Sequence, residues 1–512
     1  MVKKILHFFL FLSYVLGLYG QSVLPTPGKV QISEGYFEGL SSKLVVYIQD
    51  TALVSLPFLQ DGIVGGSDVC LVDEAEKANL QLMLQPDSPS EGYHLKITSR
   101  SIKIEAADKA GFVYALQTLR QLKETDGRGN SRWKCIDISD SPQMKWRGFM
   151  LDSGRQYQSV ATIKKYIDMV SMLKMNVFHW HLTEGLGWRI EIKKYPQLTE
   201  KGAYVGKGVE QQGYYTQEEI RDIVAYAEQR HVTIVPEIDL PGHAEAALAS
   251  CPEYSCFGLP IEIPERGFTK NIFCAGKDRT IAFLKDVLDE VCSLFPSPYI
   301  HLGGDEAPKG NWDVCPDCQK RIRDLGLEDS HGLQLWLSAE MAQHLKTKGR
   351  KAVFWGDVIY QTNYPLPDNV IIHWWNYRGH GDLALRKAQE MGYPVICGTN
   401  YYNYLNFPVA PWRGYEENRT FDIREAYAQN PSYKAMMEKH PSTWGMTCAL
   451  WTDDGVLESM IDERLFPRIL ALAEQMWHVG PLMPFESFYE EVMKKKIWFE
   501  KMGHAYGPAF KK

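Results

Sequence analysis

The hexapeptide His301-Leu302-Gly303-Gly304-Asp305-Glu306 lies at the end of a short apolar run that begins at Tyr299. Two glycines interrupt this run, and two adjacent carboxylates follow them. An apolar strand that ends in Gly-Gly and acidic residues is typical of an α/β barrel presenting reactive groups at its rim. Neighbouring carboxylates are costly to place together unless different environments give them different roles. The competing interpretation is a solvated acidic turn, so the surrounding sequence has to decide.

Apolar runs of the same kind recur through the C-terminal two thirds of the chain and are mostly separated by helical patterns. Buried parallel strands need helical crossovers and have continuous apolar sequences. Eight such units close into a (β/α)8 barrel, the TIM barrel. A doubly wound open sheet is the structural alternative, but it usually shows a glycine-rich phosphate loop after an early strand, and none is found. The expected strands are 147–151, 177–181, 232–238, 299–302, 352–355, 370–374, 394–397 and 447–451.

Helical periodicity fills most of the intervals between these runs. Thr216 is a good N-cap, and Glu219 three residues later completes a capping box. The expected helices are 160–173, 216–229, 280–294, 332–347 and a closing helix at 466–477.

The part of the chain before the barrel has a different pattern. Residues 93–97 and 102–106 alternate apolar and polar side chains around a short turn, which indicates a hairpin. A strand at 44–48 precedes them, and 111–122 has helical spacing. We therefore expect a small non-catalytic α+β domain over residues 21–142, followed by the barrel and a C-terminal helical segment over 143–512. No cluster of reactive groups is found in the first domain.

Composition limits the class of protein. The chain has 512 residues, 45% of them hydrophobic, which suits two or three domains with well-filled cores. The net charge is −7 and no Lys/Arg-rich run stands out, so a nucleic-acid-binding surface is not expected.

The N-terminus has the pattern of a secretory signal over residues 1–20. Lys3 and Lys4 supply a positive region, 5–18 is a short apolar segment, and Tyr19-Gly20-Gln21 is a plausible cleavage region. The alternative is an uncleaved anchor, although the run is short for a membrane span. We expect an exported protein, in a bacterial periplasm or outside the cell, with no membrane-embedded part.

Ten cysteines in an exported chain permit disulfides. Cys251, Cys256 and Cys274 flank one proline-rich loop. Cys315-Pro316-Asp317-Cys318 has the spacing of half a zinc knuckle, but no second Cys-x-x-Cys or His-x-x-x-His partner follows. We therefore expect a local disulfide or free thiols rather than a metal site.

Polar and aromatic side chains gather where the predicted strands end. In a barrel all these ends meet on one face, so carboxylates, histidines, one arginine and several aromatics would surround a single cavity. That composition suits a sugar, because flat aromatics cover its apolar face and charged groups form forked hydrogen bonds with its hydroxyls. The side chains are Asp152, Arg155, His179, His181, Glu184, Trp188, Glu237, Asp239, His243, Asp305, Glu306, Trp355, Asp357, Trp374, Trp375, Asn376, Tyr401, Tyr402, Tyr404, Asn406, Trp451, Asp453 and Asp454.

Some polar side chains within the predicted strands have structural interpretations as alternatives to a role in the cavity. Arg147 lies inside the first strand and is expected in a structural ion pair, with Glu237 a partner across the barrel. His179 and His181 form a His-x-His pattern that binds metal in other barrels. Here we expect the first of the two to face the core, and we expect no metal and no cofactor.

Several ordered motifs resemble glycoside hydrolase family 20, the β-N-acetylhexosaminidases. The hexapeptide 301–306 resembles the family's signature, and the segment 95–122 is similar to the end of the small domain that precedes the barrel in this family. The resemblance covers nearly the whole chain after residue 20. The other matching segments are 147–152 with Arg155, 176–189, 236–243 and 450–453.

The resemblance implies a retaining, substrate-assisted mechanism in which the sugar's own 2-acetamido oxygen attacks C1 to give an oxazolinium ion. Glu306 would protonate the leaving oxygen and then activate water. Asp305 would stay ionised and hold the acetamido N–H. Tyr404 would donate its hydroxyl to the acetamido oxygen, with Tyr402 as the nearest competitor.

The resemblance also implies the substrate-binding residues. Arg155 would bind the 3- and 4-hydroxyls and Asp453 the 4- or 6-hydroxyl, while His243 would connect to Glu306. Aromatic walls would come from Trp355, Trp375 and Trp451. The partners would be glycans that end in N-acetylhexosamine, and the protein would be a monomer or homodimer.

Two departures from the family pattern bear on specificity. The second motif usually carries Asp-Asp, where this chain has Glu184-Gly185. Glu184 would replace the first Asp with a longer reach to His243. Asn406 stands where the pattern has an Asp, so it retains hydrogen bonding without charge. The competing functions are a lacto-N-biosidase-type enzyme that releases disaccharides, a weakly catalytic sugar-binding protein, and a metal-dependent hydrolase using His179 and His181.

Overall fold

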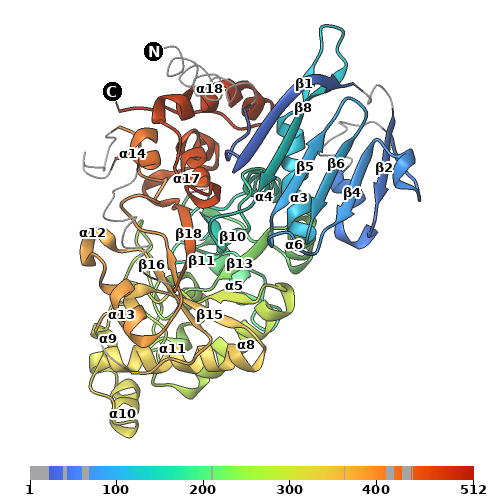
Figure 1. Cartoon of the computed structure of the whole chain (residues 1–512). Coiled ribbons are helices and arrows are strands. Elements are labelled where there is room, and N and C mark those ends of the chain that lie inside the picture. The colour runs from blue at the N-terminus through green and yellow to red at the C-terminus, as the bar shows by residue number, and fades with distance from the viewer. Residues whose placement is uncertain are drawn as a thin grey trace.

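The computed structural model describes residues 22–38, 43–59, 68–208, 211–361, 364–410, 420–428, 440 and 442–511. The predicted signal segment lies outside these residues. Two parts are visible in Figure 1, a β-sheet domain coloured blue and a larger α/β body coloured from green to red.

The larger part is a closed, eight-stranded parallel barrel, as expected. Its strand order is β10-β13-β14-β15-β16-β17-β18-β9, with β9 and β10 paired to close it. Every strand is almost fully buried, because helices cover the outside and side chains fill the inside. The strands are β9 (Trp146–Asp152), β10 (Val177–His181), β13 (Thr233–Glu237), β14 (Tyr299–His301), β15 (Lys351–Trp355), β16 (Val370–Trp374), β17 (Val395–Cys397) and β18 (Thr443–Leu450).

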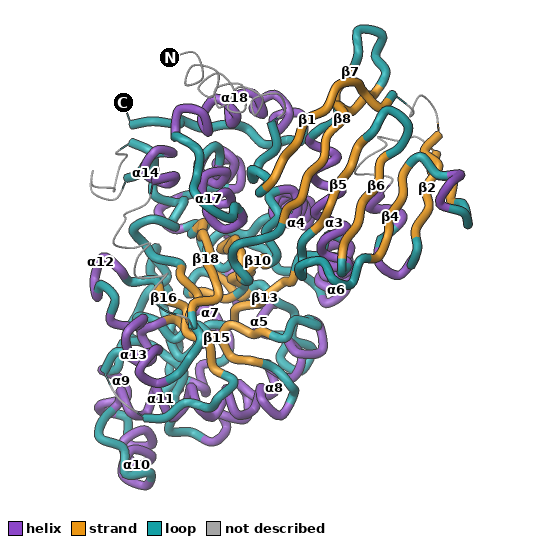
Figure 2. The backbone as a smooth tube through the Cα atoms, in the orientation of Figure 1, coloured by secondary structure: helices purple, strands orange, loops and turns teal. Residues whose placement is uncertain are grey.

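Helices connect most of these strands around the outside of the barrel, as Figure 2 shows. The capping box at the start of α6 is present, with Thr216 and Glu219 bonding each other's backbone N–H. The connection from β15 to β16 contains a short 3₁₀ helix, η7 (Gly356–Ile359). The outer helices are α4 (Val160–Met172), α6 (Gln217–Gln229), α8 (Asp278–Leu294), α11 (Ser330–Thr347), α13 (Leu383–Met391), α14 (Ile423–Ala428) and α17 (Arg468–Trp477), followed by α18 (Phe485–Lys501).

Shorter elements lie in the loops that follow the strands, at the carboxyl end of the barrel. They include the hairpin β11 (Thr183–Glu184) and β12 (Gly187–Trp188), together with α5 (Gln197–Glu200), α7 (Glu245–Ser250), α9 (Gly310–Val314), α10 (Pro316–Asp324), α12 (Tyr377–His380) and α16 (Ile461–Leu465).

The N-terminal part is a mixed sheet with one face covered by α3 (Lys109–Gln121). The predicted hairpin forms as β5 (Tyr93–Ile97) and β6 (Ile102–Ala106). The sheet order is β1-β8-β5-β6-β4-β2-β3, and β7 pairs with β8. The other elements are β1 (Lys29–Phe37), β2 (Lys43–Ile48), α2 (Leu56–Leu59), β3 (Asp68–Leu71), β4 (Leu80–Leu84), β7 (Glu124–Thr125) and β8 (Ser131–Asp140).

Buried charges join the two parts. Lys174, after α4, donates to Asp140 at 2.8 Å, and both side chains are fully buried. Arg147 forms its ion pair with Glu91 of the small domain at 2.7 Å. The expected ion pair is therefore present, but the partner Glu237 was wrong: Arg147 lies where β9 enters the barrel, whereas Glu237 ends β13 at the opposite end.

Within the described residues, no helix is long and apolar enough to cross a membrane.

Candidate active site

The two catalytic carboxylate candidates leave the barrel through a turn that only glycine fits. Gly303 and Gly304 have φ values of +61° and +97°. A Cβ on Gly303 would lie 1.9 Å from Oδ1 of Asp239, and the N–H of Gly304 donates to that same oxygen at 2.9 Å. The turn therefore presses the end of β14 onto Asp239 and projects Asp305 and Glu306 in different directions.

The two carboxylates have very different surroundings. Asp305 is buried and its Oδ1 has no hydrogen-bond partner. Burial and the nearby Asp239 raise the pKa of Asp305 well above its usual range. The Glu306 side chain is 52% exposed, and its own backbone has a φ of +48°. Asp305 is thus buried within the pocket, whereas Glu306 reaches its solvent-facing side.

His243 lies between this pair and Glu184. Its Nε2 is 3.6 Å from Asp305 and 3.7 Å from Glu306, while its Nδ1 is 2.9 Å from Glu184. Burial alone would lower the pKa of His243, but the Glu184 and Asp305 carboxylates outweigh it and raise that pKa to about 10. His243 is therefore an imidazolium at neutral pH, and Glu184 does reach it as expected.

A buried series of alternating acids and histidines continues below His243. The other oxygen of Glu184 is 3.3 Å from His181, and His181 is 2.7 Å from Glu237 in the barrel interior. Burial would raise the pKa of Glu184, but Arg155 and His243 hold it well below its usual range. This series joins His243 to the barrel core through charge-assisted hydrogen bonds, and His243 in turn lies within ion-pair distance of Asp305 and Glu306.

Arg155 follows β9 and is held by two carboxylates. It pairs with Asp152 at 2.8 Å and with Glu184 at 3.3 Å, and its guanidinium lies 5.2 Å from the centre of the Trp451 ring. The side chain keeps 17% exposure on the cavity side. Its fork is thus fixed in direction before any ligand binds.

Aromatic side chains form one wall of the cavity. Trp375 and Tyr404 are parallel within 9°, with centres 6.4 Å apart, and the ring of Trp451 lies 6.0 Å from Tyr404. In the same lining, Asn406 donates to Asp453 at 3.1 Å. The other amide atom, Oδ1 of Asn406, is buried without a partner.

These groups surround two adjoining hollows. The inner one, about 210 Å³, is lined by Arg155, His243, Asp305, Glu306, Trp375, Asn400, Tyr404, Asn406, Phe407, Trp451 and Asp453. The outer one, about 820 Å³, shares four of them and is further lined by Gln156, Glu184, Leu186, Gln211, Glu265, Arg266, Phe268, Thr452 and Gly455. Glu306 and His243 stand at the boundary between the two. The cavity therefore has a small part and a wide part, with the exposed carboxylate between them.

Ten of the eleven predicted site residues line these hollows, and Trp355 is the exception. Trp355 is buried one layer deeper, donates to Glu237 at 2.8 Å, and has its ring 5.9 Å from that of Trp451. It supports the wall from behind. Tyr402 packs on Tyr401 outside the lining, so Tyr404 is the tyrosine that faces the carboxylates.

The structure adds Asp357 to the site. Its Oδ1 accepts from the backbone N–H of Glu306 at 3.3 Å, and its Oδ2 accepts from the Trp375 indole at 2.6 Å. Burial and Glu306 raise the pKa of Asp357. Its place after the fifth strand was the only sequence signal for it. Asn400 and Phe407 also line the inner hollow, and nothing in the sequence distinguished them.

The two histidines of the competing metal-hydrolase interpretation face the barrel interior instead of the cavity. His179 and His181 both contact the same oxygen of Glu237, at 2.8 and 2.7 Å. Burial and His301 lower the pKa of His179 to about 4. His179, His301 and His373 lie close enough together to hold an ion, but none of the three lines the cavity that holds the carboxylates.

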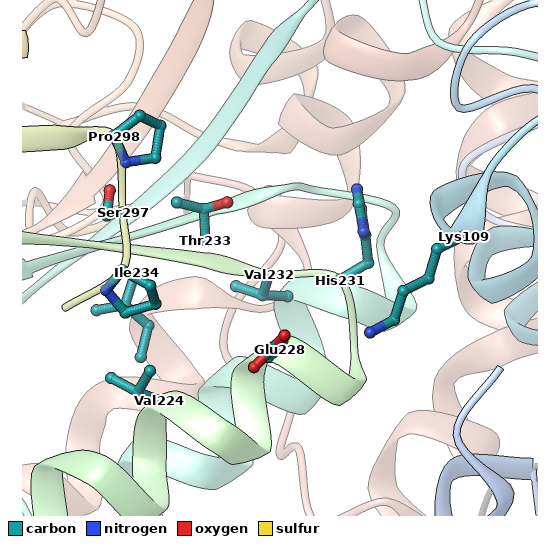
Figure 3. Close-up of a pocket in the computed structure, with 10 residues that line it drawn as sticks. Lys109, Val224, Glu228, His231, Val232, Thr233, Ile234, Ser297 and Pro298 are labelled. Carbon is teal, nitrogen blue, oxygen red and sulfur yellow. The ribbon is translucent and has the colours of Figure 1, made fainter. Parts of the chain in front are cut away.

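A second cavity lies at the other end of the barrel. It is lined by Lys109 of α3, by the C-terminal half of α6 and by the start of β13, as Figure 3 shows. His231 and Glu228 face it, but it holds no cluster of acids and no aromatic wall. It has none of the features expected for the reaction.

Comparison with known proteins agrees with the geometry. The model of the catalytic domain of glycosyl hydrolase family 20 matches residues 144–479, and that of domain 2 of the same family matches residues 20–141. The chain belongs to glycoside hydrolase family 20. The small domain and the barrel of this family-20 protein thus correspond to two recognised modules.

Individual relatives show the same relationship. A β-N-acetylhexosaminidase from Bacteroides fragilis has 57% identity and a TM-score of 0.92, covering 96% of this chain and 98% of that one. A family-20 exo-β-N-acetylglucosaminidase from Vibrio harveyi, solved with N-acetylglucosamine, has 30% identity and a TM-score of 0.82, covering 96% and 80%. A curated β-hexosaminidase from Porphyromonas gingivalis is 36% identical. The match covers 90% of this family-20 chain but only 60% of that relative's length.

Proposed function

We propose that this protein is an exo-acting, retaining β-N-acetylhexosaminidase that removes terminal GlcNAc or GalNAc by substrate-assisted catalysis. The observation that carries the proposal is the difference in burial between the two carboxylates. Asp305 is buried in the inner hollow, and Glu306 is half-exposed at its mouth. A two-carboxylate retaining site places its acids on opposite sides of the bond. Asp305 and Glu306 are adjacent in the chain, and this arrangement suits a reaction in which the substrate supplies its own nucleophile.

The inner hollow supplies groups for a single N-acetylated sugar ring. Asp305 offers an unpartnered oxygen that would accept the acetamido N–H. The positive charge that develops there would lower the raised pKa of this carboxyl and keep it ionised, so that it stabilises that charge. Tyr404 would donate to the acetamido oxygen and align it with C1. Trp375 and Trp451 would cover the acetamido group and the sugar face, with Trp355 behind them.

The hydroxyl groups would be recognised by the charged side of the hollow. The fork of Arg155 is pre-oriented by Asp152 and Glu184 and would bind the 3- and 4-hydroxyls. Asp453 would bind the 4- or 6-hydroxyl. The unpartnered Oδ1 of Asn406 would accept from one of the same hydroxyls.

Proton transfer would take place at the boundary of the two hollows. Glu306 would protonate the leaving oxygen of the group that occupies the outer hollow, and would later take a proton from the attacking water. The His243 imidazolium would hold both carboxylates in place. Asp357 would fix the backbone of Glu306 and the indole of Trp375 at the same time.

The test of the acid/base role is Glu306→Gln assayed on an aryl N-acetyl-β-hexosaminide. We expect kcat/KM to fall by about 10²- to 10⁴-fold. The control Glu328→Gln, at an exposed carboxylate that lines neither hollow, should leave kcat/KM unchanged. Full retention of activity in Glu306→Gln would overturn the assignment.

The test of substrate assistance is progressive fluorination of the substrate's N-acetyl group. Fluorine withdraws electrons from the attacking oxygen, so kcat should fall steeply with each substitution, and a thiazoline analogue of the oxazoline should inhibit. A rate insensitive to fluorination would point to an enzyme nucleophile. Separating mono- from disaccharide products would distinguish this activity from that of a lacto-N-biosidase.

A further inference from the structure

Four cysteine sulfurs meet beside the active site. Cys256, Cys274, Cys315 and Cys318 are all buried, and their Sγ atoms all lie within 4.8 Å of one another. They come from three segments: the loop after α7, the segment that leads into α8, and the start of α10. The sequence prediction of a local disulfide or free thiols missed this group, because only the last two of the four form a Cys-x-x-Cys pair.

We propose that these four cysteines bind one structural zinc ion. A tetrahedral ion about 2.3 Å from each of four sulfurs places those sulfurs about 3.8 Å apart. The Sγ separations are 3.5 Å for Cys274–Cys318, 3.8 Å for Cys274–Cys315 and 4.0 Å for Cys256–Cys318. All three separations agree with that value to within about 0.3 Å.

The four sulfurs do not form two isolated pairs, because all of them lie within 4.8 Å of one another. Cys274 is near both Cys315 and Cys318, and Cys318 is near both Cys256 and Cys274. All four sulfurs therefore share one centre. Soft thiolates in a tetrahedral S₄ set select zinc, or mononuclear iron, over hard cations such as calcium or magnesium.

The surroundings favour thiolates. Cys315 is the N-cap of α10 and Cys318 lies in its first turn, where the helix dipole stabilises negative charge. On binding, the zinc would replace the thiol protons, which would leave to solvent.

Cations and close packing enclose the group. Lys277 donates to the carbonyl of Ser255 at 2.5 Å, and Arg321 donates to that of Gly276 at 3.0 Å. Both positive charges are thus held next to the ligand-bearing segments, where they would partly offset the charge of a ZnS₄ centre, with Arg321 also paired to Asp278. A Cβ on Gly276 would lie 2.2 Å from the backbone N of Cys318, so these segments are in direct backbone contact.

The position indicates what the ion would do. Cys256 and Cys274 are the two ends of a loop that carries Glu265, Arg266 and Phe268, which line the outer hollow. Cys315 follows Glu306 by nine residues. The zinc would tie the base of the outer-cavity loop to the segment that leaves the acid/base candidate, and so would fix the rim of the site without taking part in the reaction.

The test is elemental analysis of the full chain purified without reductant or chelator. We expect one zinc per chain, and ten thiols reactive with Ellman's reagent in denaturant after chelation. Protein expressed in medium with cobalt in place of zinc should show the charge-transfer and d–d absorption bands of a tetrahedral thiolate site. No metal together with four fewer thiols would overturn the proposal in favour of two disulfides, and iron at the same stoichiometry would overturn the assignment to zinc.

The matched variants are Cys318→Ser and Cys251→Ser. Cys251 is as buried as Cys318 and lies in the loop that carries Cys256, but it is outside the four-sulfur group. We expect Cys318→Ser to lose the zinc and Cys251→Ser to keep it. If Cys318→Ser does not fold, mercurial titration of the wild-type thiols decides, because zinc should be released in step with modification; release of none would contradict the site.

Discussion

At the scale of single residues, His243 holds the catalytic carboxylates together through its charge. Its folded pKa is raised to about 10 by Glu184 and Asp305, above the ordinary value of about 6.5. The stabilisation is therefore complete below about pH 6.5 and is lost as the pH rises through about 10. His243→Gln should remove this dependence.

Urea unfolding of the wild type and of His243→Gln at pH 6, 8 and 10 measures this effect. The difference in unfolding free energy should be largest at pH 6 and shrink steadily towards pH 10. A difference that is constant across this range would show that folding does not raise the pKa of the His243 imidazole.

Substitutions of Asn406 test whether the absence of a negative charge at this position affects KM for the substrate. Asn406→Asp would place a carboxylate about 3 Å from Asp453, where the amide now donates. We expect KM to rise about tenfold at pH 7, equivalent to about 1.4 kcal/mol, and to recover at low pH as the pair takes up a proton. Asn406→Ala separates the lost amide from the added charge, because its KM should not depend on pH in this way.

At the scale of elements, the end of β14 is set by steric fit. Gly303→Ala would demand a left-handed φ of +61° and would drive a Cβ into Asp239. We expect destabilisation by about 2 to 5 kcal/mol from backbone strain and overpacking. Activity should fall as well, because Asp305 and Glu306 would move.

The matched control is Gly310→Ala at the start of α9, where a Cβ would meet nothing within 4 Å. It should leave both the melting temperature and kcat/KM unchanged. Equal melting temperatures for the two variants would contradict the steric account of the turn.

At the scale of the whole molecule, Lys174 and Asp140 join the small domain to the barrel. Removing one member of a fully buried pair leaves an uncompensated charge and costs about 3 to 5 kcal/mol. Lys174→Met should therefore lower stability by that amount and expose the domain junction to proteases. Lys164→Met, which breaks the largely exposed pair with Asp222, should cost less than about 1 kcal/mol.

We also propose export of the whole protein through its N-terminal segment. N-terminal sequencing of protein recovered from the periplasm or the medium should begin at Gln21, after removal of residues 1–20. Recovery of the full-length chain in the membrane fraction would instead identify an uncleaved anchor.

Much of the molecule could be predicted from local sequence. The eight barrel strands and the helix with the Thr216 capping box follow from apolar runs, periodicity and caps, because those signals depend on neighbours a few residues apart. Ten of the eleven predicted site residues line the cavity for a related reason: a barrel brings every strand end to one face, so position along a strand is enough to place them.

Long-range pairings needed the tertiary structure. Arg147 pairs with Glu91, Asp357 fixes Glu306, and Cys256 and Cys274 join a Cys-x-x-Cys pair more than 40 residues further on. No local pattern encodes such partners, because they are chosen by which side chains the closed barrel and its loops bring within a few ångströms. The chain alone thus determined the barrel and the face that carries the chemistry, while packing decided which charges and sulfurs meet, since Coulomb and ligand-bonding energies depend on distance in space and not on separation in sequence.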